Sequence, residues 1–217
     1  MKSILILSFL IVFVCSPAAF SQSRSTTVAG VSFENTVQVG GETLVLNGAG
    51  VRTKSFFKVY AAGLYITESK KATADVLALR GPKRIAITIL RDISAEDAGQ
   101  SFNAALVANL SREERARMVT SIAELNELLG TTPVLKKGDV ITLDLVPGSG
   151  LRCSLNGKTI GETIGNADFY KAVLRVWLGD RSVDRVLKTA LLQGIGPGNV
   201  EPTILRRPGR PITDNNN

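Results

Sequence analysis

The stretch LNGAGVRTKSFFKVYAAGLYI, residues 46–66, is the part of the chain that says most about the fold. Its second half, residues 55–66, carries apolar residues at both odd and even positions, which is typical of a strand in the middle of a sheet. Glycine accepts backbone conformations that other residues avoid, so Gly48-Ala49-Gly50 indicates a turn before this strand. The stretch therefore predicts a central strand that follows a glycine-rich turn.

Three side chains here do not suit a strand that only fills a core: Arg52, Lys58 and Tyr60. Side chains alternate along a strand, so two faces are expected. The mixed face would hold Phe56, Lys58, Tyr60, Ala62 and Leu64, and the better core face would hold Phe57, Val59, Ala61, Gly63 and Tyr65. Small residues at mid-strand leave room for another group to approach. The mixed face is therefore a candidate ligand surface.

The flanking sequence predicts more strands and several helices. Alternating residues from Val28 and the Gly40-Gly41 pair predict one hairpin, and Asn156-Gly157 predicts another. Further strands are expected over 84–91 and 139–146, and helices over 73–79, from Ser94, from Ser111 to Gly130, from Asn166 to Gly179 and from Ser182 to Gly194. This order indicates an α+β fold with a mostly antiparallel sheet, covered by helices on at least one face.

The N-terminal residues have the composition of a targeting segment. Residues 1–21 combine Lys2, an apolar run from Ile4 to Cys15 and a short stretch of small residues, which is the pattern of a secretory signal peptide. A membrane anchor that stays on the chain is the alternative. We expect the protein to be periplasmic or secreted.

The rest of the chain is expected to be one domain with two polar ends. Residues 22–27 are a polar spacer, and residues 28–193 form the domain. Residues 195–217 contain several prolines and few aliphatic residues, which predicts a disordered tail.

The composition excludes several kinds of chemistry. The chain has no histidine, which rules out Ser-His-Asp and Cys-His catalysis. Once residues 1–21 are removed, Cys153 is the one cysteine left, so zinc and iron–sulfur sites are excluded and no metal or other cofactor is expected. We interpret Cys153 and Trp177 as core residues.

The net charge of +7 raises the question of an acidic partner. The basic residues are scattered and aromatic residues are few, so nucleic acid is not expected. A solvated basic surface is the simpler interpretation, and weak attraction to an anionic membrane surface is the alternative.

An arginine beside a phenol over an apolar floor suits a carboxylate with an apolar body. The guanidinium can form a bidentate, charge-assisted pair, and the phenol can add one hydrogen bond. The competing interpretation is that Arg52 pairs with Glu34 or Glu42 while Lys58 extends to solvent. The residues alone leave both open.

The motif GAGVR followed by FFKVYAAGLYI, together with ISAED before the first long helix, resembles the chalcone isomerase family. The resemblance extends from about Val28 to Gln193, and the exported, histidine-free form is similar to the bacterial members. It implies an open-faced β-sandwich, in which a large antiparallel sheet is backed by helices and a ligand cleft lies between them.

The resemblance also implies roles for particular residues. Arg52 matches the arginine that polarises the substrate when the plant enzymes close a chalcone to a flavanone. Tyr60 stands at the position of a catalytic threonine, and Asp97 at that of a catalytic tyrosine, so two positions depart from the enzymes. Asn103 fits an asparagine of the site, and Arg91 is a further candidate for the cleft.

Three functions follow as hypotheses. The first is a binding protein for a fatty-acid-like or aromatic carboxylate, which Arg52, Lys58, Tyr60, Asn103 and Arg91 would contact. The second is an intramolecular lyase that acts on a flavonoid-like substrate, with Arg52 and Tyr60 as the catalytic pair. The third is a non-catalytic envelope protein that has lost the pocket. The oligomeric state is not predicted.

Overall fold

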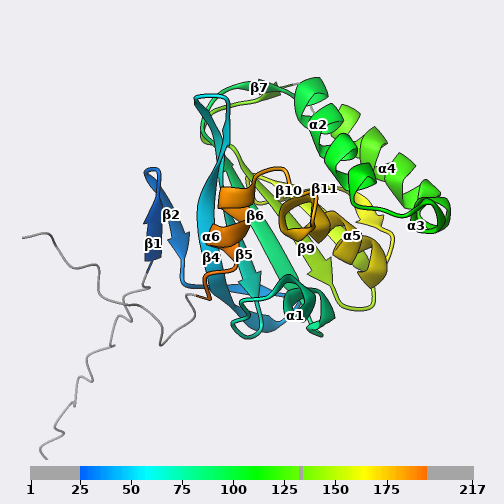
Figure 1. Ribbon diagram of the computed structural model, residues 1–217, viewed down its shortest axis with the longest axis horizontal. Coiled ribbons are helices and arrows are strands. Elements are labelled where there is room, and N and C mark those ends of the chain that lie inside the picture. Colours follow the sequence, from blue (N-terminus) through cyan, green and yellow to red (C-terminus); the bar gives the residue numbers. More distant parts are fainter. Residues whose placement is uncertain (1–24, 132–133, 195–217) are drawn as a thin grey trace, which may run out of the picture.

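The computed structural model describes residues 25–131 and 134–194, which form a large curled sheet backed by helices (Figure 1). The expected signal peptide, 1–21, and the expected tail, 195–217, lie outside the described residues. The α+β class that the sequence predicts is confirmed.

A seven-stranded sheet forms the centre of the domain, in the order β11-β10-β9-β6-β5-β4-β3, and each neighbouring pair is antiparallel. Its strands are β3 (Thr36–Val39), β4 (Glu42–Lys54), β5 (Phe57–Ile66), β6 (Lys83–Ile89), β9 (Val140–Val146), β10 (Gly150–Leu155) and β11 (Lys158–Ile164). The turns predicted at Gly40-Gly41 and Asn156-Gly157 are present, and all four residues have positive φ angles.

Six helices accompany the sheet in the described part of the chain: α1 (Thr73–Ala78), α2 (Ala95–Ala108), α3 (Arg112–Arg117), α4 (Val119–Gly130), α5 (Ala167–Leu178) and α6 (Arg185–Leu191). Ser94, Ser111 and Asn166 cap α2, α3 and α5 as expected, because each side chain accepts backbone N–H groups of the first turn. Helix α6 was expected to begin at Ser182, but its cap is Asp184, whose carboxylate accepts the backbone N–H groups of Val186 and Leu187.

A separate hairpin covers part of the face of the sheet that points away from the helices (Figure 1). It consists of β1 (Ser25–Val28) and β2 (Val31–Glu34), so part of the expected polar spacer is a strand. Phe33 of this hairpin packs over Gly63, where an added Cβ would lie 2.8 Å from the Phe33 ring. The space expected beside Gly63 is therefore filled by the protein itself. A short pair, β7 (Ile93–Ser94) and β8 (Val134–Leu135), completes the strands.

The main core lies on the helix-covered face, which is the mixed face of β5 and not the one expected to be the better core face. Tyr60, Ala62 and Leu64 belong to the large cluster that packs against α5. Ala61 and Tyr65 belong to the smaller cluster under the β1–β2 hairpin. Periodicity identifies two faces but not which one the helices will cover. Cys153 also lies in the large cluster, as expected, and burial raises the pKa of its thiol to about 12.

The GAGVR glycines are not a turn, which corrects the expectation from the sequence. Gly48 and Gly50 lie inside β4, and neither has a positive φ angle. An added Cβ on Gly48 would lie 2.1 Å from the carbonyl oxygen of Ala190, and one on Gly50 would lie 2.6 Å from the Ala190 Cβ. The two glycines are therefore needed because α6 packs directly on the backbone of β4.

Candidate functional site

An apolar cavity of about 170 Å³ lies between the sheet and the helices. Its apolar wall comes from strands of the sheet, from β7 and β8, from the segment before α6, and from α2, α4 and α5: Val59, Ile87, Ile89, Ile93, Ala98, Phe102, Leu125, Leu129, Leu135, Ile141, Leu143, Val176 and Val183. The lining residues with polar groups are few: Arg52, Lys54, Tyr60, Asp97, Ser101 and Trp177. A mostly apolar cavity with a few polar groups is the usual form of a small-molecule site.

Arg52 lies near the end of β4 with its guanidinium at this cavity. Its Nη2 donates a hydrogen bond to Oγ of Ser101 on α2, over 3.1 Å. None of the ion pairs among the described residues involves Arg52, and Glu42 lies beside Gly81 instead. The interpretation in which Arg52 pairs with Glu34 or Glu42 therefore finds no support. A half-buried cation without a carboxylate partner can attract an anionic ligand.

Tyr60 is buried beside Arg52 and keeps its own proton. Nε1 of Trp177 donates a hydrogen bond to the Tyr60 hydroxyl oxygen over 2.9 Å, and the Arg52 guanidinium carbon lies 5.6 Å from the centre of the Tyr60 ring. Burial raises the pKa of Tyr60 above its ordinary value, although the nearby Arg52 acts in the opposite direction. The phenol therefore stays protonated at neutral pH, and its O–H can donate to a ligand.

Asp97 and Lys54 give the cavity two further charged neighbours. An Asp97 carboxylate oxygen accepts a hydrogen bond from the Ser94 hydroxyl over 2.7 Å. The ion pairs of the described residues include neither Asp97 nor Lys54. An anionic head group near Arg52 would thus feel attraction from Lys54 and repulsion from Asp97.

Lys58 lies outside the cavity because the strand register changes just before Tyr60. Arg52 pairs with Tyr60 and Thr53 with Lys58, so Val59 is an extra residue in β5. Val59 and Tyr60 consequently both line the cavity, whereas Lys58 is exposed. The expected alternation on this face is interrupted at this bulge.

The structure also places Arg91 and Asn103 away from the cavity. Arg91 is exposed, with its guanidinium carbon 4.7 Å from the centre of the Phe57 ring. Asn103 lies on another side of α2, in a shallow surface pocket that Leu129 and Asn126 of α4 also line. Its buried Oδ1 has no hydrogen-bond partner among the described residues. Of the five expected ligand contacts, the structure brings Arg52 and Tyr60 together.

Sequence reasoning missed three residues that form the site: Ser101, Phe102 and Trp177. Trp177 is in the core as expected, but it also lines the cavity, and its ring lies 5.8 Å from that of Phe102. Ser101 lies four residues after Asp97, and Phe102 lies four residues after Ala98, so the two pairs form adjacent rows on the cavity side of α2. That spacing from Asp97 could have identified Ser101. The indole N–H of a buried tryptophan requires an acceptor nearby, and this requirement could have linked Trp177 to Tyr60.

The described residues offer neither a metal site nor a membrane-spanning helix. Residues 25–131 and 134–194 contain no group of three acidic or cysteine side chains that could hold a metal ion. None of the helices in these ranges is long and apolar enough to cross a membrane.

Comparison with known proteins agrees with this architecture. The family described as chalcone isomerase-like matches residues 25–193 of the chain. No curated protein matches the chain significantly. Among solved structures, the crystal structure of a fatty-acid binding protein from Arabidopsis thaliana is similar, with a TM-score of 0.65 and 16% sequence identity. The match covers 78% of this chain and 96% of the plant protein, and at this identity it shows the fold.

Proposed function

Since the chain belongs to the chalcone isomerase-like family, we propose that it binds an apolar carboxylate, with the head group at Arg52 and the apolar body in the cavity. The observation that carries this proposal is the state of Arg52. Its guanidinium faces an apolar cavity without a carboxylate partner among the described residues, and Ser101 accepts one of its five donor hydrogens. The similar plant protein is a fatty-acid binding protein, which is consistent with a ligand of this kind.

The cavity volume limits the ligand. An apolar cavity of about 150 Å³ holds one benzene molecule. A cavity of about 170 Å³ thus takes one aromatic ring, or an acyl chain of roughly eight carbons or fewer. A longer chain would have to project from the mouth or move α2 and α4. We therefore propose a phenyl-substituted or medium-chain carboxylic acid.

The lyase alternative has the donors it needs but also an obstacle. Arg52 and the Tyr60 hydroxyl could both polarise a ketone in the cavity. Asp97, on the same wall, would oppose the negative charge that develops on an enolate. The envelope-protein alternative, which requires a filled cleft, is not supported, because the cavity is present.

The binding test uses the one tryptophan of the chain as its probe. Trp177 lines the cavity, so its fluorescence reports on occupancy. The parent protein and Arg52→Gln are titrated with octanoate, 3-phenylpropionate and the methyl ester of each acid. Lys58→Gln is the matched control, since Lys58 is an exposed cation next to the site.

We expect the parent and Lys58→Gln to prefer each acid to its ester. Arg52→Gln should bind the acids at least tenfold more weakly and lose this preference, because charge-assisted hydrogen bonds contribute about 1.5–3 kcal/mol. Equal affinity of Arg52→Gln and the parent for the acids would refute the proposal. Cyclisation of a chalcone by the parent, well above the rate with Arg52→Gln, would favour the lyase.

We further propose that the protein is exported, on the basis of the composition of residues 1–21. N-terminal sequencing of the protein from fractionated cells tests this. A mature chain that begins near residue 22 in the exported fraction is expected. An intact Met1 on cytoplasmic protein would contradict it.

A further inference from the structure

The turn between β4 and β5 exposes two aromatic rings that the fold does not use. Phe56 is 95% exposed and Phe57 is 60% exposed, and both lie at the tip of this hairpin. Ser55 beside them has a φ angle of 55°, which is the left-handed region typical of a tight turn. Leaving two neighbouring aromatic side chains in water is unfavourable, so they indicate a contact beyond the described residues.

The same tip is positively charged. Lys54 and Lys58 flank the aromatic pair, and the Arg91 guanidinium lies over the Phe57 ring at 4.7 Å. None of these three cations belongs to an ion pair of the described residues. The tip segment from Lys54 to Lys58 contains no carboxylate, and the Asp184 carboxylate beside it accepts the Thr53 N–H at 3.1 Å and caps α6.

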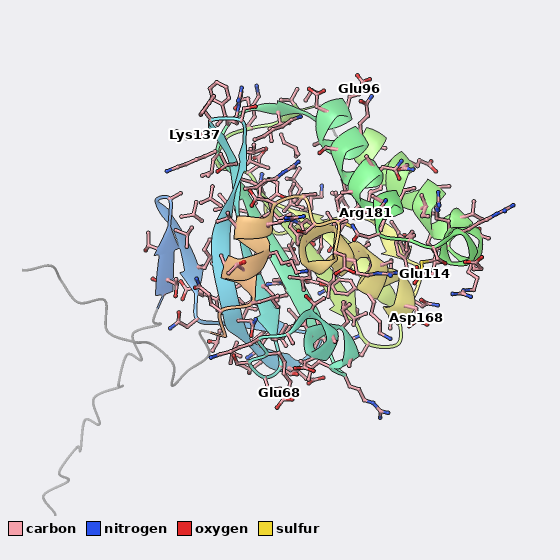
Figure 2. All side chains as sticks on the ribbon, in the orientation of Figure 1. Glu68, Glu96, Glu114, Lys137, Asp168 and Arg181 are labelled. Carbon is pink, nitrogen blue, oxygen red and sulfur yellow. The ribbon has the colours of Figure 1, made fainter. Side chains whose placement is uncertain are left out.

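The surroundings add charge of both signs. Lys137 projects outward at this end of the molecule, whereas Glu96 lies farther along, at the start of α2 (Figure 2). Asp92 is the nearest acid in sequence to Arg91, and it forms an ion pair with Lys136 at 3.1 Å and accepts the backbone N–H of Lys137. Its charge is therefore largely compensated.

We propose that this tip, residues 54–58 with Arg91, docks on a lipid bilayer that contains anionic lipid. Phenylalanine rings partition into the boundary between head groups and acyl chains, and neighbouring basic side chains are attracted to anionic head groups. Lysine and arginine keep their charged ends at that level while their stems lie along the apolar region. The net charge of +7 adds a weaker, longer-range attraction.

The size of the tip favours a membrane over a protein partner. A stable protein interface buries about 800 Å² on each partner. Two phenylalanine side chains provide at most about 300–500 Å². A convex tip with two aromatic side chains and three nearby cations is too small for such an interface. It can insert into a lipid surface, which needs no matching shape.

Docking would place the cavity beside the lipid. Arg52 and Lys54 line the cavity and precede the tip on the same strand. An amphipathic acid that partitions into the bilayer could then enter the protein directly from the lipid surface. This consequence rests on the proposed function, whereas the docking itself does not.

The test compares the parent with Phe56→Ser/Phe57→Ser in flotation with phosphatidylcholine vesicles, with and without one-third phosphatidylglycerol. Both proteins are isolated from cells in the same way, so any contribution of the N-terminal segment is common to them. Val186→Ser is the matched control, since Val186 is an apolar residue on α6 that is 77% exposed. Phe56→Trp adds an indole at the tip, and the parent, in which Trp177 alone emits, is its reference, because bromine-labelled lipid quenches an indole that enters the bilayer.

We expect the double variant to bind the anionic vesicles about tenfold more weakly or worse than the parent, and Val186→Ser to bind like the parent. Lys54→Gln/Lys58→Gln should weaken anionic binding by more than about tenfold and leave neutral vesicles unaffected. Quenching of the Phe56→Trp indole is expected on the anionic vesicles.

Vesicle binding by the double variant equal to that of the parent, or an unquenched indole, would overturn the proposal. So would a smaller oligomer of the double variant than of the parent without a change in vesicle binding, because the tip would then be a protein interface. The double variant should keep its affinity for octanoate, and Arg52→Gln should keep its affinity for vesicles. The two proposals can therefore fail separately.

Discussion

The indole of Trp177 donates a hydrogen bond to the hydroxyl oxygen of Tyr60 over 2.9 Å, and this bond joins α5 to β5 across 117 residues of sequence. Both side chains are buried, and both line the cavity. One interaction thus connects the helix layer to the sheet and also sets the wall of the proposed ligand site.

We expect Tyr60→Phe to lower the free energy of unfolding by about 1–3 kcal/mol, because it leaves the Trp177 N–H buried without an acceptor. Trp177→Phe should also destabilise the protein, partly through lost ring contacts. In the double variant neither partner remains, so its loss should be about 1 kcal/mol smaller than the sum of the single losses. Urea unfolding of the four proteins measures this coupling, and strictly additive losses would contradict it.

Gly48→Ala should destabilise the protein by about 2–4 kcal/mol, since the new Cβ would collide with the backbone of Ala190 and move α6. Gly130→Ala is the control, because a Cβ there meets no atom within 4 Å and the residue is helical. Alanine at that position should keep or raise stability by up to about 1 kcal/mol. Thermal unfolding of both variants checks this, and equal effects would argue against the close packing of α6.

The ion pair between Glu114 and Arg175 predicts a dependence of stability on acid pH. Oε1 of Glu114 lies 2.8 Å from Nη2 of Arg175, and Glu114 lies at the α3 end of the molecule (Figure 2). Arg175 and the Ser111 N–H hold the pKa of Glu114 below its ordinary value. The stabilisation is therefore present above the unfolded pKa, about 4.3, and is lost as pH falls through the folded pKa.

Glu114→Gln should accordingly be less stable than the parent at neutral pH, and the difference should shrink below about pH 4. Unfolding by urea at several pH values measures the two curves. Parallel curves over the whole range would show that Glu114 does not carry this dependence.

Lys83 predicts a second rise of stability with pH, in the alkaline range. Its ammonium donates to the carbonyl oxygens of Leu79 and Gly81, and burial lowers its pKa to about 8. Between that value and the unfolded value of about 10.4, the unfolded chain binds more protons, so stability should rise with pH. Raised pKa values of the buried tyrosines Tyr60, Tyr65 and Tyr170 should oppose the rise above about pH 10.

Lys83→Met should remove the rise between about pH 8 and 10, while leaving the decline above it. Comparing the unfolding of this variant with that of the parent across this interval is a direct measurement. A rise that persists in Lys83→Met would assign the dependence to another group.

The sequence predicted the sheet and the main helices, because those depend on local patterns. Alternation, helix caps and hairpin turns are each encoded within a few residues. The errors concern contacts between distant segments. Gly48 and Gly50 were interpreted as a turn because a turn and a close helix contact both require glycine. The residue that makes the close contact, Ala190, lies far along the chain, so no local pattern reveals it.

The site was only partly predictable for a similar reason. A single extra residue, Val59, ends the alternation and sends Lys58 to solvent, and no local pattern marks such a bulge. On α2, an error of a few positions exchanges Asn103 for Ser101, because neighbouring helical residues face different directions. Trp177 belongs to the apolar stripe of α5, and such a stripe does not show whether a residue packs in the core or lines a cavity.

Strand β4 carries three features at alternate positions: the glycines under α6, Arg52 in the cavity wall, and Lys54 before the exposed tip. Because they share one face, their spacing matters as much as their identity. A point mutation that replaces Arg52 would alter the proposed ligand site while the helix contact survives. Loss or gain of one residue between Gly50 and Arg52 would instead turn the cation to the outer face. Under the proposed function, substitutions in this strand can change ligand specificity, whereas insertions or deletions would disrupt the site.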